Sequence, residues 1–420
     1  MTAAPSPAAL TPAALADPKA FGDMAAMHAM LKKQRRAAPV SRVAVEGYPP
    51  FWLVTRHEDV KSIEERSHIF LAGPRTILGS TAAEEMMLAQ FGDRNGLKTL
   101  VHMDGEDHRK HRLVAQGWFN RTNIEKLRAQ TRAQADRFID RMAAMGGACD
   151  FAADVAFWFP LRVVMSIMGV PEEDDPKLLK LTQQMFGFMD PELGYGQQTG
   201  EAGIGQVIGD FATYVNALIE RKKASPTDDL ASVLAAAEID GAPMDAFKQL
   251  SYFIIVTTAG HDTTSASLAW GLDALIDQPE DLARLRADPA LCATAADEFV
   301  RLAAPVSHFL RTPTEDVVVG GQAIKAGETI FLSFMSAARD EALFADPDRA
   351  TIDRPVNQHM AFGHGPHVCL GKHLARMEIE VFFQQLLPRL DHAERAGPVR
   401  YVESGFVTGV KSMPIRYRMR

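Results

Sequence analysis

The sequence has few cysteines and no long hydrophobic segment. Its 420 residues include only three cysteines, which is too few for a disulfide framework, so we expect a reducing, cytoplasmic environment. No run of about 18 uncharged apolar residues occurs, which argues against a membrane-spanning helix. No basic residue precedes Lys19, so the start of the chain does not resemble a signal peptide. We expect residues 1–20 to form a disordered tail.

The remaining composition is that of a globular protein with a sizeable core. Hydrophobic residues make up 47% of the chain and charged residues 23%, which are ordinary proportions. The net charge of −8 argues against nucleic acid as a partner. Because no segment has the composition of a linker, we predict a single domain over residues 21–420, and we expect a monomer.

The periodicity of the apolar residues predicts a mainly α fold with small β-sheets, in the α+β class. Helical spacing predicts helices over 21–36, 57–66, 123–145 and 154–168. Runs rich in β-branched and aromatic residues predict strands over 42–45, 51–54, 317–319 and 329–334. The stretch 71–101 is irregular, and 171–219 mixes helical segments with many glycines; both are typical of functional or mobile segments.

The longest helical pattern runs from Met244 or the next residue to Ile276. It is apolar on most faces, which indicates a buried helix. Its middle, 257–264, reads Thr-Thr-Ala-Gly-His-Asp-Thr-Thr, and these residue types are poor helix formers. Such a local inconsistency inside a buried helix often marks a functional site. The Thr263 hydroxyl can bond back to the Ala259 carbonyl and open a groove.

The segment 362–371 places one cysteine in a loop punctuated by glycines, and a helical pattern follows it. The glycines allow the backbone to approach a flat ligand closely. Near a helix N-terminus, free N–H groups and the helix dipole should lower the pKa of Cys369 and favour the metal-binding thiolate. One thiolate cannot complete a zinc site, but it can hold a haem iron from one side. We interpret Cys149 and Cys292 as inert buried residues.

This segment, Phe-Gly-His-Gly-Pro-His-Val-Cys-Leu-Gly, resembles the haem-binding loop of the cytochrome P450 family, the haem–thiolate monooxygenases. The family pattern is Phe-Gly-x-Gly-x-His-x-Cys-x-Gly, and every fixed position is filled. His108 and Arg112 match the family's His-x-x-x-Arg pair, although in isolation they are equally consistent with a solvated basic face. Asp104 is the predicted N-cap of their helix. Residues 259–264 match the family's oxygen-activation motif.

Further segments occur in the family's order. Glu298 and Arg301 match a Glu-x-x-Arg pair that is completed by Arg354, and Ala350 departs from the pattern because the family usually has phenylalanine there. The turn 404–409 matches the segment that closes the far side of the substrate pocket. The resemblance therefore covers residues from about 100 to 410, and it implies the cytochrome P450 fold, a helix-rich single domain with a long central helix.

The resemblance also implies roles for individual residues. Cys369 would be the axial iron ligand, Thr263 would stabilise bound dioxygen, and Asp262 would gate proton delivery. The cofactor-binding residues that it implies are His108, Arg112, Ala259, Gly260, Arg311, Phe362, Gly363, His367, Cys369 and Gly371. The substrate-binding residues that it implies are Ile255, Thr258, Ser307, Phe309, Phe406 and Val407.

The expected function is hydroxylation of a small-to-medium apolar substrate, with haem b, dioxygen and electrons from NAD(P)H. The runs 259–267, 376–383 and 414–416 resemble the terpineol-oxidising bacterial members, which favours a terpenoid or alkyl-aromatic hydrocarbon. Polycyclic aromatics, steroids and fatty acids stay open as substrates. A peroxide-driven enzyme and a non-catalytic haem sensor stay open as classes, and the Asp262–Thr263 pair argues against the first.

The expected electron donor is a two-iron, two-sulfur ferredoxin, itself reduced by a ferredoxin reductase. The resemblance places several basic residues on the face behind Cys369, where they could steer an acidic partner despite the negative net charge. They are Arg109, Lys110, Arg112, Arg121 and Lys372, with His364 and His373 nearby. The alternative is that these side chains only solvate a surface.

Overall fold

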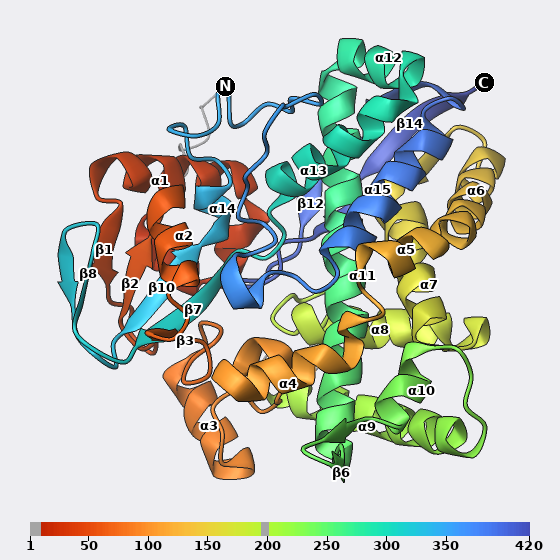
Figure 1. Cartoon of the computed structure of the whole chain (residues 1–420). Helices are drawn as coiled ribbons and strands as arrows, with labels where there is room; N and C mark the ends of the chain where they lie inside the picture. The colour runs from red at the N-terminus through yellow and green to blue at the C-terminus, as the bar shows by residue number, and fades with distance from the viewer. Residues whose placement is uncertain (1–9, 195–200) are drawn as a thin grey trace.

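The computed structural model describes residues 10–194 and 201–420, and helices predominate in it (Figure 1). The α-helices are α1 (Met24–Ala37), α2 (His57–Glu65), α3 (Thr81–Phe91), α4 (Gly105–Gln116), α5 (Arg121–Lys126), α6 (Arg128–Ala144), α7 (Trp158–Ile167), α8 (Asp175–Phe186), α9 (Glu201–Ala224), α10 (Leu230–Ala235), α11 (Ala246–Asp277), α12 (Pro279–Ala287), α13 (Cys292–Ala303), α14 (Phe334–Ala337) and α15 (Lys372–Leu386).

The strands are short and form small sheets. They are β1 (Val40–Val43), β2 (Phe51–Val54), β3 (Phe70–Leu71), β4 (Ala148–Asp150), β5 (Glu238–Ile239), β6 (Ala242–Pro243), β7 (His308–Pro313), β8 (Val317–Val319), β9 (Gln322–Ile324), β10 (Thr329–Ser333), β11 (Leu390–Arg395), β12 (Arg400–Tyr401), β13 (Val410–Ser412) and β14 (Pro414–Met419). The largest sheet has the order β1-β2-β10-β7-β3, and in it β10 runs parallel to β2 and antiparallel to β7.

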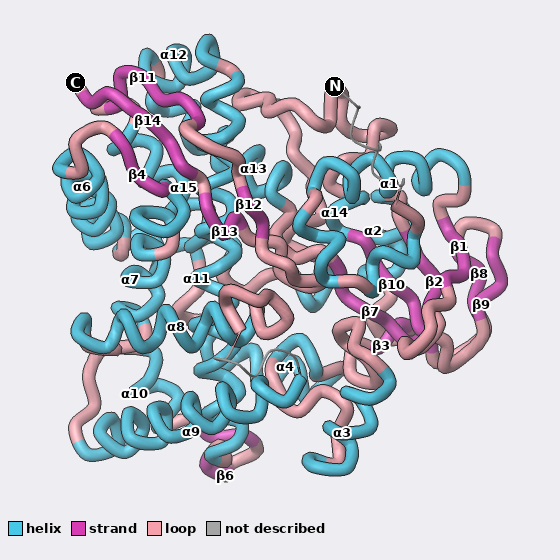
Figure 2. Tube along the Cα trace, turned by 180° about the vertical axis from the view of Figure 1, so that it is seen from behind, coloured by secondary structure: helices cyan, strands magenta, loops and turns pink. Residues whose placement is uncertain are grey.

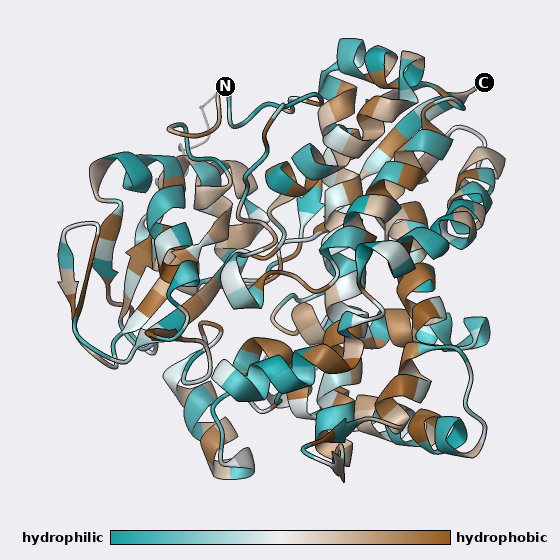
Figure 3. Cartoon of the chain, viewed as in Figure 1, coloured by the Kyte–Doolittle hydropathy of each residue, from teal (hydrophilic) through white to brown (hydrophobic). Residues whose placement is uncertain are grey.

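The central helix α11 organises the fold, as the sequence predicts. It has 32 residues and is therefore roughly 48 Å long at 1.5 Å per residue. Its N-cap is Asp245, whose carboxylate accepts the Lys248 N–H at 2.9 Å. Helices α7, α8, α13 and α15 pack around it, and the hydropathy colouring shows apolar residues along most of its length (Figure 3).

The five-stranded sheet lies to one side of α11, beside α1, α2 and α14, and helices α6 and α7 lie to the other side (Figures 1 and 2). One hydrophobic core cluster extends from Leu15 to Tyr417, so the chain folds as a single helix-rich domain. No helix in the described ranges combines the length and hydrophobicity that spanning a bilayer requires.

The N-terminal segment is more ordered than the sequence suggests. Short 3₁₀ helices occupy Pro12–Ala16 and Pro18–Gly22, and Leu15 and Ala16 are buried. The predicted disordered tail is therefore wrong for residues 10–20, because an apolar side chain anchors this segment to the core. Residues 1–9 lie outside the described part of the chain.

The stretch 71–101 contains more helix than expected, whereas the helical segments expected in 171–219 are present. Within 71–101 the chain forms α3, which Ser80 caps by accepting the Ala83 N–H at 3.0 Å. Most of 171–219 is helical in α8 and α9. Residues 195–200, between α8 and α9, lie outside the described part.

Asp104 shows a second correction. Its backbone takes the N-cap position of α4, but its carboxylate makes no capping bond. It accepts instead the N–H groups of Ala72 at 2.9 Å and Gly73 at 2.7 Å. The side chain therefore ties the segment before α3 to the start of α4, since these backbone donors would otherwise be unpaired.

Candidate active site

A cavity of about 490 Å³ lies between the loop 362–371 and the middle of α11. Cys369 lines one wall, and Ala259, Gly260 and Thr263 line another. These segments are far apart in sequence, and the helix packing around α11 brings them together. A volume of this size is in the usual range for small-molecule and cofactor sites.

Two glycines fix the shape of the cysteine loop. Gly363 has φ of 67° and Gly365 has φ of 62°, which side chains other than glycine rarely adopt. At Gly365 a Cβ atom would lie only 2.5 Å from the Glu64 carbonyl oxygen, so the loop packs closely on α2. The Cys369 N–H donates to the Phe362 carbonyl at 2.8 Å, which closes the loop and holds the cysteine at the cavity.

The electrostatics of Cys369 differ from the prediction. Burial raises the pKa of its thiol, and this outweighs the lowering effects of the Gly371 N–H and of Arg112. The cysteine precedes α15 by three positions, so the helix terminus does not generate a free thiolate. A metal ion that replaces the thiol proton would have to stabilise the thiolate itself. Cys149 and Cys292 do not line the cavity, and burial raises their pKa values to about 12.

Groups that bind carboxylates collect at one edge of the cavity. His108, Arg112, Arg311 and His367 all line it. The rings of His108 and His367 lie with centroids 4.3 Å apart, and Arg112 donates to the Val368 carbonyl at 2.8 Å. Burial, followed by the charges of His367 and Arg112, lowers the pKa of His108 to about 4. A bound carboxylate would oppose that effect and favour the protonated ring.

Glu64 of α2 is a site residue that the sequence did not reveal. Its buried carboxylate pairs with Arg311 at 2.6 Å and accepts the His364 N–H at 3.3 Å. Arg311, on β7, thus has an internal carboxylate partner as well as access to the cavity. A glutamate in a helix that otherwise resembles a surface helix gave no sequence signal for this contact.

The middle of α11 contains the Thr263 back-bond that the sequence predicts, within a continuous helix. Thr263 donates to the Ala259 carbonyl at 2.7 Å, and Thr258 donates to the Ile254 carbonyl at 2.6 Å. Burial raises the pKa of Asp262 to about 7, and its Oδ2 atom has no hydrogen-bond partner among the described residues. His261 does not line the cavity, and its Nδ1 atom is hydrogen-bonded to the Thr182 hydroxyl.

The remaining cavity walls are mainly apolar. Of the predicted substrate-binding residues, the structure places five at the cavity: Ile255, Thr258, Phe309, Phe406 and Val407. Ser307 does not line it, because its hydroxyl is directed at the Gly405 carbonyl 2.5 Å away. Its neighbour His308 lines the cavity instead.

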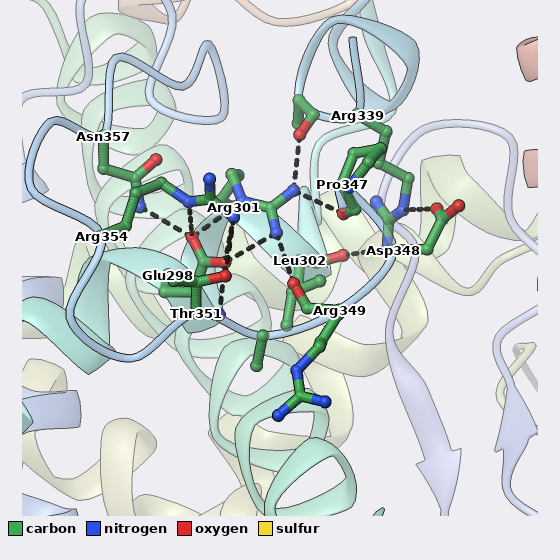
Figure 4. A network of polar contacts seen from close by, with 12 residues as sticks. Glu298, Arg301, Leu302, Arg339, Pro347, Asp348, Arg349, Thr351, Arg354 and Asn357 are labelled. Carbon is green, nitrogen blue, oxygen red and sulfur yellow. Dashed lines mark hydrogen bonds and ion pairs between the residues drawn. The ribbon is translucent and has the colours of Figure 1, made fainter. Parts of the chain in front are cut away.

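The predicted Glu298, Arg301 and Arg354 network is present behind the site (Figure 4). The Glu298 carboxylate is fully buried, and it accepts hydrogen bonds from Arg301 at 2.8 Å and from Arg354 at 3.0 and 3.1 Å. These donors offset the cost of burial and hold its pKa below the usual range. Ala350 fills the usual phenylalanine position, and Gln278 bonds to its backbone.

A model of the family described as Cytochrome P450 matches residues 47–290 and 291–415. The chain belongs to the cytochrome P450 family. It is 38% identical over 95% of both chains to Cytochrome P450-terp of a Pseudomonas species. A crystal structure of a cytochrome P450 from Novosphingobium aromaticivorans has a TM-score of 0.89 and 38% identity, and it covers 97% of this chain and 99% of that chain.

Two other relatives differ in what their names say they oxidise. The chain is 31% identical to a steroid C26-monooxygenase of Rhodococcus jostii, over 88% of this chain and 76% of that protein. It is 29% identical to the linalool 8-monooxygenase of Pseudomonas putida, over 92% and 95%. The chain is therefore a P450 monooxygenase, an oxidoreductase that incorporates oxygen, and the family uses a haem held by a cysteine thiolate.

Proposed function

We propose that this chain hydroxylates a small-to-medium apolar substrate, a terpenoid or alkyl-aromatic hydrocarbon, at a haem b held by Cys369. The observation that carries the proposal is the cavity itself, which has Cys369 on one wall and the Asp262–Thr263 pair near the other, with apolar side chains between them. Steroids, fatty acids and polycyclic aromatics are the alternative substrates. The three free cysteines suit a cytoplasmic location.

The residues around the cavity fit a haem. Cys369 supplies the single thiolate, while His108, Arg112, Arg311 and His367 supply donors for two propionates. Phe362, Gly363 and Gly371 would flank the ring on the cysteine side, and Ala259 and Gly260 on the α11 side. When bound, the haem supplies the activation of dioxygen, and the thiolate favours cleavage of the O–O bond.

Asp262 and Thr263 control protons in this proposal. A carboxyl group with a pKa of about 7 can both hold and release a proton near neutral pH, which general acid–base work requires. Thr263 already donates its proton to the Ala259 carbonyl, so its oxygen can accept a hydrogen bond from a group in the cavity. Together they can deliver protons singly from the α11 side.

The substrate class rests on the walls and on the relatives. Ile255, Phe309, Phe406 and Val407 offer apolar and aromatic surface, which suits a hydrocarbon. The terpene-related relatives have names and coverage that favour a terpenoid, whereas the steroid-oxidising relative keeps the larger substrates as the second candidate.

A ferredoxin is the proposed electron donor, and it would dock on the outer face of the 362–371 loop. Helix α5 packs against α15, and the charges of Lys372, Arg376 and Arg121 all act on His373, so these cations lie together. The contribution of Arg109 is partly offset by Glu106, and that of Lys110 by Asp240. Leu113 of α4 is 51% exposed and offers an apolar contact beside these charges.

The test is turnover of the haem-loaded protein on a panel of α-terpineol, linalool, p-cymene, a steroid and a fatty acid. NADH, ferredoxin and ferredoxin reductase are supplied in one arm and hydrogen peroxide in another. We expect a substrate-induced shift of the Soret band and product coupled to NADH with the terpenoids. Product only with peroxide would favour the peroxide-driven enzyme, and binding without product in either arm would favour a haem sensor.

A further inference from the structure

His308, at the start of β7, is hydrogen-bonded through both ring nitrogens. The Leu78 N–H donates to its Nε2 atom at 3.0 Å, and its Nδ1 atom lies 2.8 Å from the Ser307 hydroxyl. Because Nε2 accepts a hydrogen bond, the neutral ring carries its proton on Nδ1 and donates it to Ser307. The Ser307 hydroxyl in turn donates to the Gly405 carbonyl at 2.5 Å. The chain of bonds therefore runs in one direction from Leu78 to Gly405.

These bonds join three walls of the cavity. Leu78 lies in the segment before α3, His308 lies on β7, and Gly405 lies in the 404–409 turn. All three residues line the cavity. The backbone supports the same junction, because Leu310 donates to the Thr76 carbonyl at 2.8 Å and Ser307 donates to the Phe406 carbonyl at 2.9 Å.

The ring of His308 is also fixed by packing. It stacks on Phe331 of β10, with centroids 4.1 Å apart and planes at 15°, and it meets Phe406 edge-on at 5.9 Å. Burial lowers the pKa of His308 to about 3, so the ring stays neutral over the pH range of function. Both hydrogen bonds therefore persist, which a protonated ring could not provide because Nε2 would lose its lone pair.

We propose that His308 is a positioning residue that holds the segment before α3 and the 404–409 turn against β7, and thereby sets the cavity width and which ligands fit. It does not take part in the chemistry. Its effect on hydroxylation rests on the substrate class proposed above, but its effect on cavity width does not depend on that class.

The variants separate the hydrogen bonds from the ring. His308→Phe keeps an aromatic ring on Phe331 and removes both bonds. His308→Gln offers an oxygen to the Leu78 N–H and an amide N–H to Ser307, so it should restore the links. Ser307→Ala removes the hydroxyl that accepts from Nδ1 and donates to Gly405, and it leaves the Leu78 bond to Nε2 in place. The matched control is His57→Phe, since His57 is also buried, bonds to the Gln358 carbonyl through Nε2 and does not line the cavity.

Imidazole and 4-phenylimidazole are suitable probes for the haem-loaded protein, because an imidazole nitrogen ligates haem iron and only the second ligand also needs the walls. In His308→Phe we expect the Kd of 4-phenylimidazole to rise about tenfold while that of imidazole stays unchanged, since positioning errors of this kind have large effects. Ser307→Ala should raise the ratio of the 4-phenylimidazole Kd to the imidazole Kd by a smaller factor. His308→Gln and His57→Phe should leave this ratio near the wild-type value.

Amide hydrogen exchange gives a second readout that requires no ligand. Exchange at Leu78 should rise about fivefold in His308→Phe, as expected for loss of one hydrogen bond. Unchanged Kd ratios and unchanged Leu78 exchange in His308→Phe would overturn the proposal. So would an equal effect in His57→Phe, or failure of His308→Gln to restore the ratio. If His308→Phe does not fold, Ser307→Ala and His308→Gln decide it in the same way.

With a turnover substrate from the panel, the ratio of major to minor hydroxylated product should fall in His308→Phe. If no panel member gives product, the proposed substrate class fails, and the probe affinities and Leu78 exchange still decide the role of His308.

Discussion

The Glu298 carboxylate and the Arg354 guanidinium form two parallel hydrogen bonds across 56 residues of sequence. Arg301 binds the same carboxylate, so one glutamate holds two arginines and thereby fixes the 345–357 loop on α13 (Figure 4). The Thr351 N–H and the Asn357 side-chain amide also donate to it. Donors of the protein itself thus satisfy the hydrogen-bonding capacity of this buried carboxylate.

Removing this carboxylate should destabilise the protein strongly. Glu298→Ala leaves two arginines without their counter-charge, and breaking a buried pair in this way costs roughly 3–5 kcal/mol. Chemical denaturation of the haem-loaded protein would measure the free energy of unfolding. Lys325→Ala, which breaks the exposed pair to Asp316, is the control and should cost little, because exposed ion pairs contribute little to stability. Equal losses in both variants would contradict the argument.

The absorption spectrum of the haem-loaded protein should identify the cysteine that ligates the iron. Cys369→Ser should abolish the strongly red-shifted Soret band that the reduced protein forms with carbon monoxide, because no other cysteine lines the cavity. Cys292→Ser serves as the control and should retain the band. A wild-type band like that of a histidine-ligated globin, or loss of the band in Cys292→Ser, would show that Cys369 is not the ligand.

Thr263→Ala should uncouple NADH consumption from product formation. The variant keeps the apolar walls, so haem content and substrate affinity should stay near wild-type values, while electrons are lost to peroxide because the hydroxyl no longer helps to control protonation. Product and peroxide per NADH measure the effect. Thr257→Ala removes a hydroxyl that bonds within the same helix and does not line the cavity, and it should remain coupled.

Asp262 should make stability depend on pH in a definite direction. Burial raises its pKa from the ordinary 3.8 to about 7, so between these values the folded protein holds a proton that the unfolded chain releases. The contribution of the Asp262 carboxyl to the free energy of unfolding is fully present below about pH 4, and it is lost as the pH rises through about 7. Asp262→Asn lacks the titration. Its free energy of unfolding relative to wild type should increase across this window, by roughly 1.4 kcal/mol per unit of displaced pKa; a flat difference would refute the shift.

Charge reversal on the outer face of the haem loop should slow electron transfer. Arg121→Glu and Lys372→Glu reverse two cations whose charges both act on His373, and Arg109→Glu should have a smaller effect because Glu106 already offsets that charge. Stopped-flow reduction by ferredoxin should be slowed most at low salt, because the Debye length falls to about 10 Å at 0.1 M. Lys325→Glu, on the remote β8–β9 side, is the control. Rates that do not change with these substitutions or with salt would exclude this docking face.

The sequence predicted the parts of the fold that depend on local patterns. The periodicity of α11 and its Thr263 back-bond follow from residue spacing, because each depends on few neighbours, whereas the Glu298–Arg354 pair was expected only from the family resemblance. The pKa of Cys369 could not be predicted in this way, since burial by distant segments outweighs the nearby N–H groups and cations. The contacts of Glu64 and Asp104 also depend on tertiary approach, as does the choice between Ser307 and His308 as the cavity residue.

Two hydroxyl groups of α11 act only as hydrogen-bond acceptors toward the cavity. Thr258 and Thr263 line it, and each has already given its only proton to a carbonyl of its own helix. Toward a guest molecule these side chains present lone pairs alone, so they can satisfy an alcohol but not a ketone or an ether. A hydroxylated product could therefore donate a hydrogen bond to this wall, which its parent hydrocarbon could not do. Further oxidation of the product to a carbonyl compound would remove that hydrogen bond.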